Sequence, residues 1–220
     1  PGTVTAHTTY KVLSNNTLDI TFDATTDKET VVNMTNHSYF NLNGDPSKEG
    51  TNMWLYLNAD NYTPADSTYM TTGEILPVEG TPMDFRKAHA LSQTINDTSF
   101  EQIRNASGYD HNWCLNTYKD GKGDDTKVCA VLWSPLTKIG LSMYTNEPGV
   151  QVYTGNFQGT GVSCKHGVKY PKHVSVCLES QKYPDSPNKH NWPSPYLKQG
   201  EKYYSHVAYR FWTGDFSTDK

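Results

Sequence analysis

The segment Thr17–Ala24 alternates strictly between polar and apolar side chains, and this alternation is the feature that most constrains the fold. The apolar positions share one face: Leu18, Ile20, Phe22 and Ala24. A period of two residues predicts a half-buried β-strand. Asn15-Asn16 comes before this segment and predicts a hairpin turn that joins it to a partner strand over Thr8–Leu13.

Short strand-like runs recur along the rest of the chain, separated by turn clusters rich in Gly, Pro, Asn and Asp. They are Val31–Thr35, Met53–Leu57, Trp113–Thr117, Lys127–Trp133, Gly140–Thr145, Val150–Tyr153, Val174–Leu178 and Tyr203–Trp212. Only Leu91–Arg104 has a weak helical pattern. Because no repeat and no linker interrupts the series, we expect residues 1–220 to form a single all-β domain.

Charge and hydropathy exclude several classes of partner. Lys and Arg number 19 against 23 Asp and Glu, which gives a net charge of −4, and no basic block occurs. This argues against binding to nucleic acid or to an anionic membrane surface. The chain has no apolar run long enough to span a bilayer, and Pro1–Val4 has neither the basic nor the apolar part of a signal peptide.

The four cysteines leave their redox state open. Cys114 and Cys129 lie symmetrically about the turn at Asp120–Gly123, so in a simple hairpin they could bridge, or they could be two reduced core thiols. Cys164 and Cys177 could pair in the same way, although Cys177 lies in an apolar run and could simply be buried. No cysteine or histidine pair has metal-ligand spacing, so we expect no metal.

Six Asn-X-Ser/Thr sequons begin at Asn15, Asn33, Asn36, Asn61, Asn96 and Asn105. Together with the sparse charge and the even number of cysteines, they favour a secreted glycoprotein. A cytoplasmic location is the alternative.

Four segments carry more polar and aromatic residues than a plain sandwich needs. His37 lies in a polar cluster after a strand, where it is either a proton-transfer group or a histidine in a surface loop. Asp110 opens a strand between aromatic residues, where its carboxylate either binds sugar hydroxyls or caps a turn. Gln151 lies within a Val/Tyr strand and must bond to backbone or ligand. Glu179 ends an apolar strand, where it is either a general base of raised pKa or a solvated carboxylate.

In this order, the four segments resemble the aldose 1-epimerase (galactose mutarotase) family. The matching blocks are Asn36-His37-Ser38-Tyr39-Phe40-Asn41-Leu42, Asp110-His111-Asn112, Pro148-Gly149-Val150-Gln151-Val152-Tyr153-Thr154-Gly155-Asn156-Phe157, and Leu178-Glu179-Ser180-Gln181 followed by Pro184-Asp185-Ser186-Pro187-Asn188. The tail, from Pro193 through Tyr209-Arg210-Phe211, is similar to the family's C-terminus.

The resemblance implies a large antiparallel β-sandwich, the galactose mutarotase-like supersandwich, and interconversion of the α and β anomers of a free aldose. It gives Glu179 the role of general base and His37 that of general acid. Asp110 would hold sugar hydroxyls and Gln151 would be a further substrate contact. Ring opening by these groups needs only proton transfer, so no cofactor is expected.

The chain resembles the C-terminal part of the family's domain, without its usual N-terminal third. That segment would supply further strands and sugar-binding residues. We therefore expect a separate N-terminal fragment or chain to associate with this one and complete the fold, since long unpaired strand edges are rare in soluble proteins.

Three other functions remain open. A non-catalytic carbohydrate-binding protein of the same fold would keep Asp110 and Gln151 but not the acid–base pair. A hexose-6-phosphate 1-epimerase should carry Arg or Lys in the sugar-binding loops, and the Pro184–Pro195 loop has only Lys189. A glycosidase, which needs two carboxylates across the scissile bond, would have to use Asp110 and Glu179.

Overall fold

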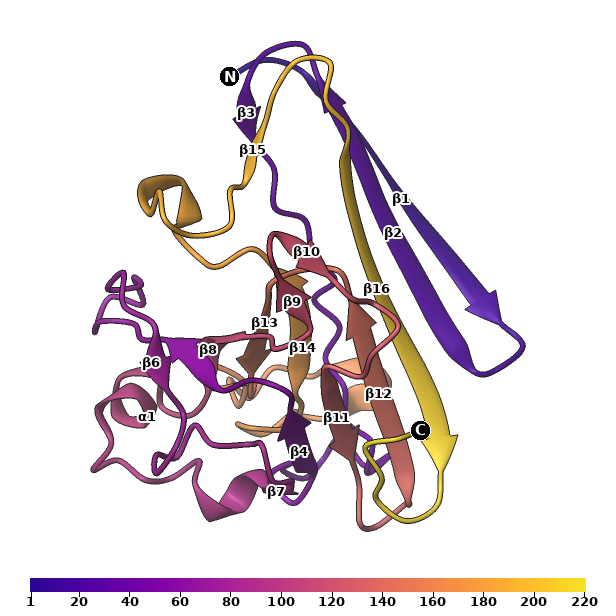
Figure 1. Cartoon of the computed structure of the whole chain (residues 1–220). Helices are drawn as coiled ribbons and strands as arrows, with labels where there is room; N and C mark the ends of the chain where they lie inside the picture. Colours follow the sequence, from indigo (N-terminus) through magenta and orange to yellow (C-terminus); the bar gives the residue numbers. More distant parts are fainter.

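The computed structural model describes residues 1–220, and its regular secondary structure is almost entirely β-strands in antiparallel sheets, joined by long loops and turns (Figure 1). The larger sheet has seven strands in the order β1-β2-β16-β12-β11-β4-β7, and the smaller sheet has five in the order β14-β13-β8-β5-β6. The strands of the larger sheet are β1 (Val4–Leu13), β2 (Thr17–Thr26), β16 (Tyr203–Thr213), β12 (Ile139–Thr145), β11 (Ala130–Trp133), β4 (Trp54–Leu57) and β7 (His89–Ala90). Those of the smaller sheet are β14 (Cys177–Gln181), β13 (Gly149–Tyr153), β8 (Asp110–Cys114), β5 (Asn61–Thr63) and β6 (Leu76–Pro77).

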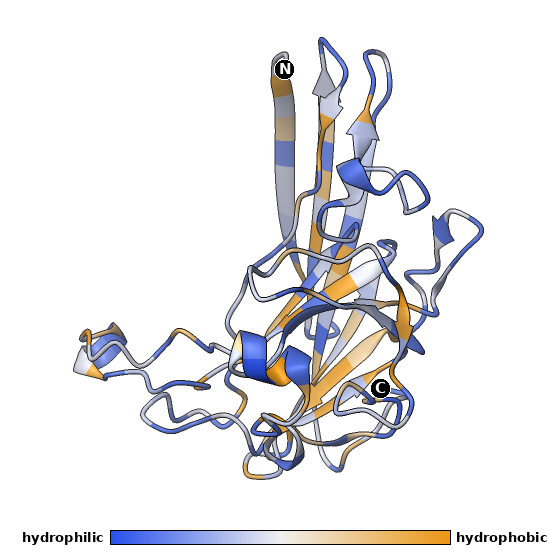
Figure 2. Ribbon diagram, turned by 90° about the vertical axis from the view of Figure 1, so that its left-hand side faces the viewer, coloured by the Kyte–Doolittle hydropathy of each residue, from blue (hydrophilic) through white to orange (hydrophobic).

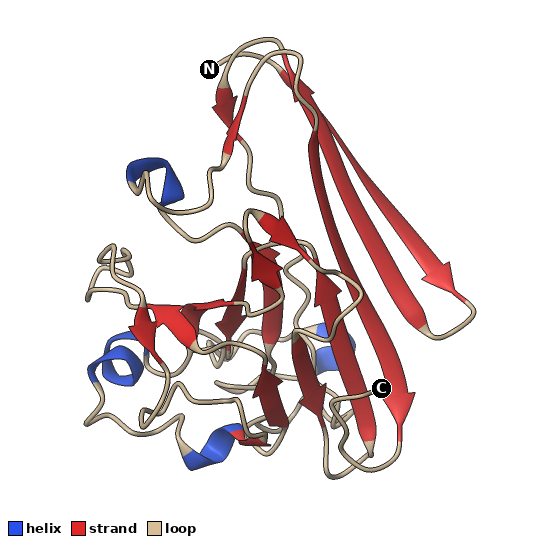
Figure 3. Ribbon diagram, in the orientation of Figure 1, coloured by secondary structure: helices blue, strands red, loops and turns tan.

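Two strand pairs and a few short helical turns complete the structure (Figure 3). The pairs are β9 (Tyr118–Lys119) with β10 (Lys122–Gly123), and β3 (Thr30–Val31) with β15 (Tyr196–Leu197). The helical segments are α1 (Glu101–Ala106), η1 (Leu91–Gln93), η2 (Lys165–Gly167) and η3 (Ser186–Asn188). None of these short helical segments could span a lipid bilayer.

The hydrophobic core joins the two sheets. One cluster of 32 buried residues takes Ile20, Phe22 and other side chains from the larger sheet, and Val150, Val152 and Leu178 among others from the smaller one. The hydroxyl of Tyr209 on β16 donates a hydrogen bond of 2.7 Å to the Leu178 carbonyl on β14, so the sheets are also tied by a polar contact. The predicted all-β sandwich is therefore confirmed.

The hairpin predicted at Asn15-Asn16 is present. Strands β1 and β2 pair in register from Val4↔Thr26 to Leu13↔Thr17, and Asn16 adopts a positive φ of 61° in the turn. Strand β2 buries Ile20, Phe22 and Ala24 as the alternation predicts.

Strand β1 lies at the edge of the larger sheet and is exposed along all ten residues. It pairs with β2 on one side only, and Val12 and Tyr10 are 86% and 58% exposed. With β2 and β16 it extends beyond the rest of the molecule (Figures 1 and 2). This edge is a row of free backbone hydrogen-bonding groups of the kind that pairs with further strands.

Two expected elements were wrong, two expected strands are shifted, and the structure decides between the alternatives for Cys114 and Cys129. Strand β8 covers Asp110–Cys114 rather than Trp113–Thr117, and β14 covers Cys177–Gln181 rather than Val174–Leu178. The helical pattern over Leu91–Arg104 breaks into η1, a turn and α1. Strand β3 ends at Val31, so the expected strand to Thr35 is extended loop. The turn at Asp120–Gly123 joins only the short β9 and β10. Cys114 on β8 belongs to the smaller sheet, whereas Cys129 precedes β11 of the larger sheet, so the two do not face each other across a hairpin. All four cysteines are free thiols.

Candidate active site

The register of three neighbouring strands gathers polar side chains on one face of the smaller sheet. Gln151 on β13 pairs with Glu179 on β14 and with Asn112 on β8. Tyr153 pairs in the same way with Cys177 and Asp110. Directly opposite residues, and residues two apart along a strand, share a face. This polar face is therefore made by Asp110, Asn112, Gln151, Tyr153, Cys177 and Glu179.

The opposite face of the same strands is the core. The residues between the polar positions, among them Trp113, Val150 and Leu178, are fully buried. His111 lies on this side too, and burial lowers its pKa to about 4. Of the two titratable residues in the Asp110-His111 pair, only Asp110 is thus directed to the polar face.

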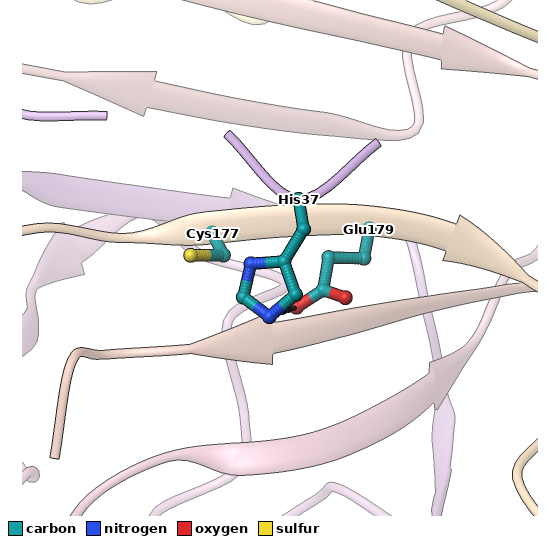
Figure 4. A group of neighbouring side chains, drawn as sticks. All are labelled: His37, Cys177 and Glu179. Atoms are coloured by element: carbon teal, nitrogen blue, oxygen red, sulfur yellow. Dashed lines mark ion pairs between the residues drawn. The ribbon is translucent and has the colours of Figure 1, made fainter. Parts of the chain in front are cut away.

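His37 reaches the polar face from a loop rather than from a strand. Phe40 and Val176 exchange two backbone hydrogen bonds of 2.9 Å, which hold the loop against the residues that lead into β14. The His37 Nε2 then lies 3.4 Å from the Glu179 Oε1 (Figure 4). The His37 side chain is 49% exposed and that of Glu179 only 10%.

Two tyrosine rings flank His37. The Tyr39 ring stacks on the imidazole with centroids 5.0 Å apart, and the Tyr153 ring meets both rings edge-on at 6.2 Å. Such rings restrict the motion of the imidazole and offer apolar surface to the face of a sugar. Tyr39 remains 49% exposed and so is available to a ligand.

Glu179 is poised to accept a proton near neutral pH. Burial, followed by the negative charge of Asp110, raises the pKa of Glu179 from 4.5 to about 7. Burial also raises the pKa of Asp110, although the hydrogen bond from Gln151 and the charge of His37 act in the opposite direction. General bases are most effective when their pKa lies near the working pH.

A chain of side-chain amides supports Asp110. Gln151 Nε2 donates to Asp110 Oδ1 at 2.8 Å, and Gln181 Nε2 donates to Gln151 Oε1 at 2.9 Å and to Asn112 Oδ1 at 3.1 Å. Gly149 leaves room for these amides, since a Cβ there would collide with the Asn112 side chain. The Gln151 amide thus bonds to a side chain of the site, not to backbone.

All four residues singled out in the sequence, His37, Glu179, Asp110 and Gln151, meet on this polar face. Sequence reasoning gave no role in the site to Tyr39, Tyr153, Gln181 or Cys177. The first three lie within the matching blocks, and Cys177 directly precedes one of them. Cys177 and Gln181 flank Glu179 at two-residue spacing, and that spacing is the signal that could have placed them on its face.

The first two lysines after Glu179 in the chain are paired with carboxylates. Lys182 Nζ lies 3.0 Å from Glu147 Oε2, and Lys189 Nζ lies 2.9 Å from Asp185 Oδ2. Neither is an unpaired cation ready to receive a phosphate.

Known proteins resemble this chain in sequence. The family model described as aldose 1-epimerase matches residues 1–210. The galactose mutarotase of Mus musculus is 39% identical over 211 residues, which cover 96% of this chain and 58% of that protein. The aldose 1-epimerase of Escherichia coli is 39% identical over 214 residues, which cover 96% of this chain and 59% of that protein. This chain therefore spans less than two-thirds of the length of these relatives.

Solved structures show the same fold. The aldose epimerase homologue from C. elegans superposes with a TM-score of 0.83 at 27% identity, over 98% of this chain and 62% of that one. The galactose 1-epimerase from Lactobacillus acidophilus NCFM gives a TM-score of 0.79 at 28% identity, over 98% and 59% of the two chains. The family model, the sequence relatives and the fold agree, and this chain belongs to the aldose 1-epimerase family.

Proposed function

We propose that this protein interconverts the α and β anomers of free aldoses such as galactose and glucose by acid–base ring opening. The observation that carries the proposal is the 3.4 Å separation of His37 Nε2 and Glu179 Oε1 on a face that also holds Asp110. The reaction requires one proton to leave the C1 hydroxyl and one to reach the ring oxygen. Both oxygens are bonded to C1, so two groups as close as these can serve both.

In the proposed mechanism the Glu179 carboxylate takes the proton from the C1 hydroxyl while the His37 imidazolium gives a proton to the ring oxygen O5. The C1–O5 bond breaks and an open-chain aldehyde forms. Rotation about C1–C2 presents the other face of the carbonyl, and the protons return as the ring closes. Each positioned group contributes a rate factor of ~10²–10⁴, which is adequate for a reaction that proceeds slowly in water.

Asp110 and Gln151 are proposed to hold the sugar. Gln151 directs its amide to Asp110 Oδ1, which leaves the other carboxylate oxygen available to sugar hydroxyls. The exposed Tyr39 ring offers a stacking surface. A neutral sugar suits this face better than a sugar phosphate, because Lys182 and Lys189 are each paired with a carboxylate.

Polarimetry of freshly dissolved α-glucose and α-galactose tests the activity, with Glu179→Gln as the decisive variant. We expect Glu179→Gln to abolish mutarotation while sugar binding, measured by calorimetry, survives. Glu29→Gln is the matched control, since Glu29 is an exposed carboxylate before β3. Full activity of Glu179→Gln would remove this carboxylate from the mechanism, and sugar binding without mutarotation by the unmutated protein would favour a carbohydrate-binding protein.

We also propose that a further polypeptide segment pairs with the exposed edge of β1. The support is that all ten residues of β1 are exposed and that its outer edge has no strand partner. Intact-mass analysis under denaturing conditions of protein purified in its native state should reveal a second component or a longer chain. A single component of 24.7 kDa with full mutarotation activity would contradict this proposal.

We propose that the protein is secreted and that only some of its sequons carry a glycan. Asn15 in the β1–β2 turn and Asn96 are exposed and can accept a glycan. Asn33 is engaged instead, because its side chain donates to the Lys182 carbonyl at 3.0 Å and accepts from the Lys182 amide at 2.9 Å. Mass spectrometry of protein from its natural source, before and after enzymatic removal of N-glycans, should show glycan at Asn15 or Asn96. No mass change at either would count against secretion.

A further inference from the structure

Three side chains able to bind a metal converge at the polar face. His37, Cys177 and Glu179 each offer one ligand atom, and these atoms all lie within 4.8 Å of one another (Figure 4). Cys177 and Glu179 are two residues apart on β14 and so point to the same side, and His37 closes the group from its loop. The proposed ring opening uses His37 and Glu179 but has no role for the Cys177 thiol.

The donor set fits zinc. Thiolate sulfur, imidazole nitrogen and carboxylate oxygen are the three ligand types of Zn²⁺, at about 2.0–2.3 Å in tetrahedral geometry. Ligand atoms of such a site lie about 3.3–3.8 Å apart, and His37 Nε2 and Glu179 Oε1, at 3.4 Å, already meet this spacing. The Cys177 sulfur lies within 4.8 Å of both atoms, so it needs to approach by about an ångström at most, a shift of the size that a χ1 rotation of about 30° makes.

The surrounding charge also favours a cation. Asp110 adds a second carboxylate to the polar face, its negative charge acts on Glu179, and both groups are largely removed from water. A divalent ion would relieve their mutual repulsion. His37 is half exposed, which gives an ion a route to the buried partners.

We propose that His37, Cys177 and Glu179 form a Zn²⁺ site and that its occupation reversibly inhibits the enzyme. The inhibitory part rests on the proposed function. Binding joins neutral His37 Nε2, the Glu179 carboxylate and the Cys177 thiolate to the ion. The Cys177 thiol proton and the Nε2 proton of the His37 imidazolium are released to solvent. A bound ion removes the proposed acid and base together, so metal and aldose exclude each other. The fourth position of the tetrahedron remains for water.

Co²⁺ binding tests the site without reference to activity. Titration of the whole protein with Co²⁺ should produce a sulfur-to-cobalt charge-transfer band in the near ultraviolet, and Zn²⁺ and galactose should each abolish it. Cys177→Ser should remove the band, whereas Cys164→Ser, which changes a more accessible thiol, should keep it. Absence of the band in the unmutated protein, or its persistence in Cys177→Ser, would overturn the site.

Polarimetry with added Zn²⁺ tests the inhibition. The mutarotation rate of the unmutated protein should fall as Zn²⁺ is added. In Cys177→Ser the Zn²⁺ concentration that gives half inhibition should be about tenfold higher or more. Mg²⁺, which prefers oxygen ligands, should have no effect. Equal zinc sensitivity of the unmutated protein and Cys177→Ser would overturn the proposal. If Cys177→Ser does not fold, His37→Ala replaces it in the cobalt titration. A cobalt affinity equal to that of the unmutated protein would then overturn the site. A protein that shows the cobalt band but no mutarotation would keep the site and lose the proposed function.

Discussion

The side-chain amide of Gln181 donates a hydrogen bond of 2.9 Å to Oε1 of Gln151. Because that oxygen is engaged, the NH₂ group of Gln151 must face the other way, toward Asp110, to which it donates at 2.8 Å. Gln181 thereby orients the side-chain amide of Gln151, which in turn donates to Asp110, the proposed sugar-binding carboxylate. It is a positioning residue and has no direct part in proton transfer.

Gln181→Ala should weaken substrate binding more than catalysis. The variant loses the hydrogen bonds to Gln151 and Asn112, and only the first supports Asp110. Loss of that one, worth about 1 kcal/mol, should raise KM roughly fivefold and change kcat by less than about twofold. Saturation kinetics by polarimetry separates the two constants. Gln93→Ala, an exposed glutamine in η1, serves as control, and Gln181→Glu should not restore KM, because its carboxylate cannot donate. A fall confined to kcat would contradict the positioning role.

The pH dependence of kcat/KM should show an acid limb near pH 7. Glu179 must be deprotonated to act as base, and burial with the charge of Asp110 raises its pKa to about 7. Below this value, kcat/KM should fall about tenfold per pH unit. Asp110→Asn removes the second cause and should move the limb to lower pH, whatever its effect on KM. A limb that stays in place would show that burial alone sets the pKa.

Glu179→Gln should stabilise the fold at alkaline pH. The pKa of Glu179 is raised above its unfolded value of 4.5, so its contribution to stability is fully present below pH 4.5 and is lost as the pH rises through about 7. The neutral amide of Glu179→Gln avoids this loss. Compared with the unmutated protein, the variant should have a free energy of unfolding about 1–3 kcal/mol higher at pH 8 and nearly the same at pH 4. Urea denaturation at the two pH values measures it. An equal effect at both would rule out the ionisation of Glu179 as its cause.

The buried pair of Lys182 and Glu147 should be essential to stability. Their side chains are 19% and 3% exposed, and the Lys182 ammonium also lies 5.3 Å from the centroid of the Tyr203 ring. Glu147→Gln leaves the lysine uncompensated and should destabilise the protein by about 3–5 kcal/mol.

Lys127→Met is the control for this prediction, because Lys127 forms an exposed pair with Asp124 that is worth about 0–1 kcal/mol. Chemical denaturation compares the two variants. Equal small effects would show that Lys182 reaches water when its partner is lost.

Local pattern was sufficient for most strands. The alternation over Thr17–Ala24 places Ile20 and Phe22 in the core, and the turn at Asn15-Asn16 sets the register of β1 and β2, because both signals act between near neighbours in the chain. The pattern over Leu91–Arg104 was misleading. There the structure turns between η1 and α1 so that Leu91, Ile95 and Ile103 all enter the core, and tertiary packing overrides a weak propensity.

The amino-acid sequence by itself determined the all-β class and, through the four motif blocks, the family and the four residues of the candidate site. Only the tertiary structure decided that Cys114 and Cys129 lie in different sheets, that Gln181 supports Gln151, and that Cys177 lies beside His37 and Glu179. The physical reason is that strand pairing joins segments far apart in the chain. His37 meets β14 because Phe40 and Val176 exchange backbone hydrogen bonds, and no spacing within the sequence encodes that contact.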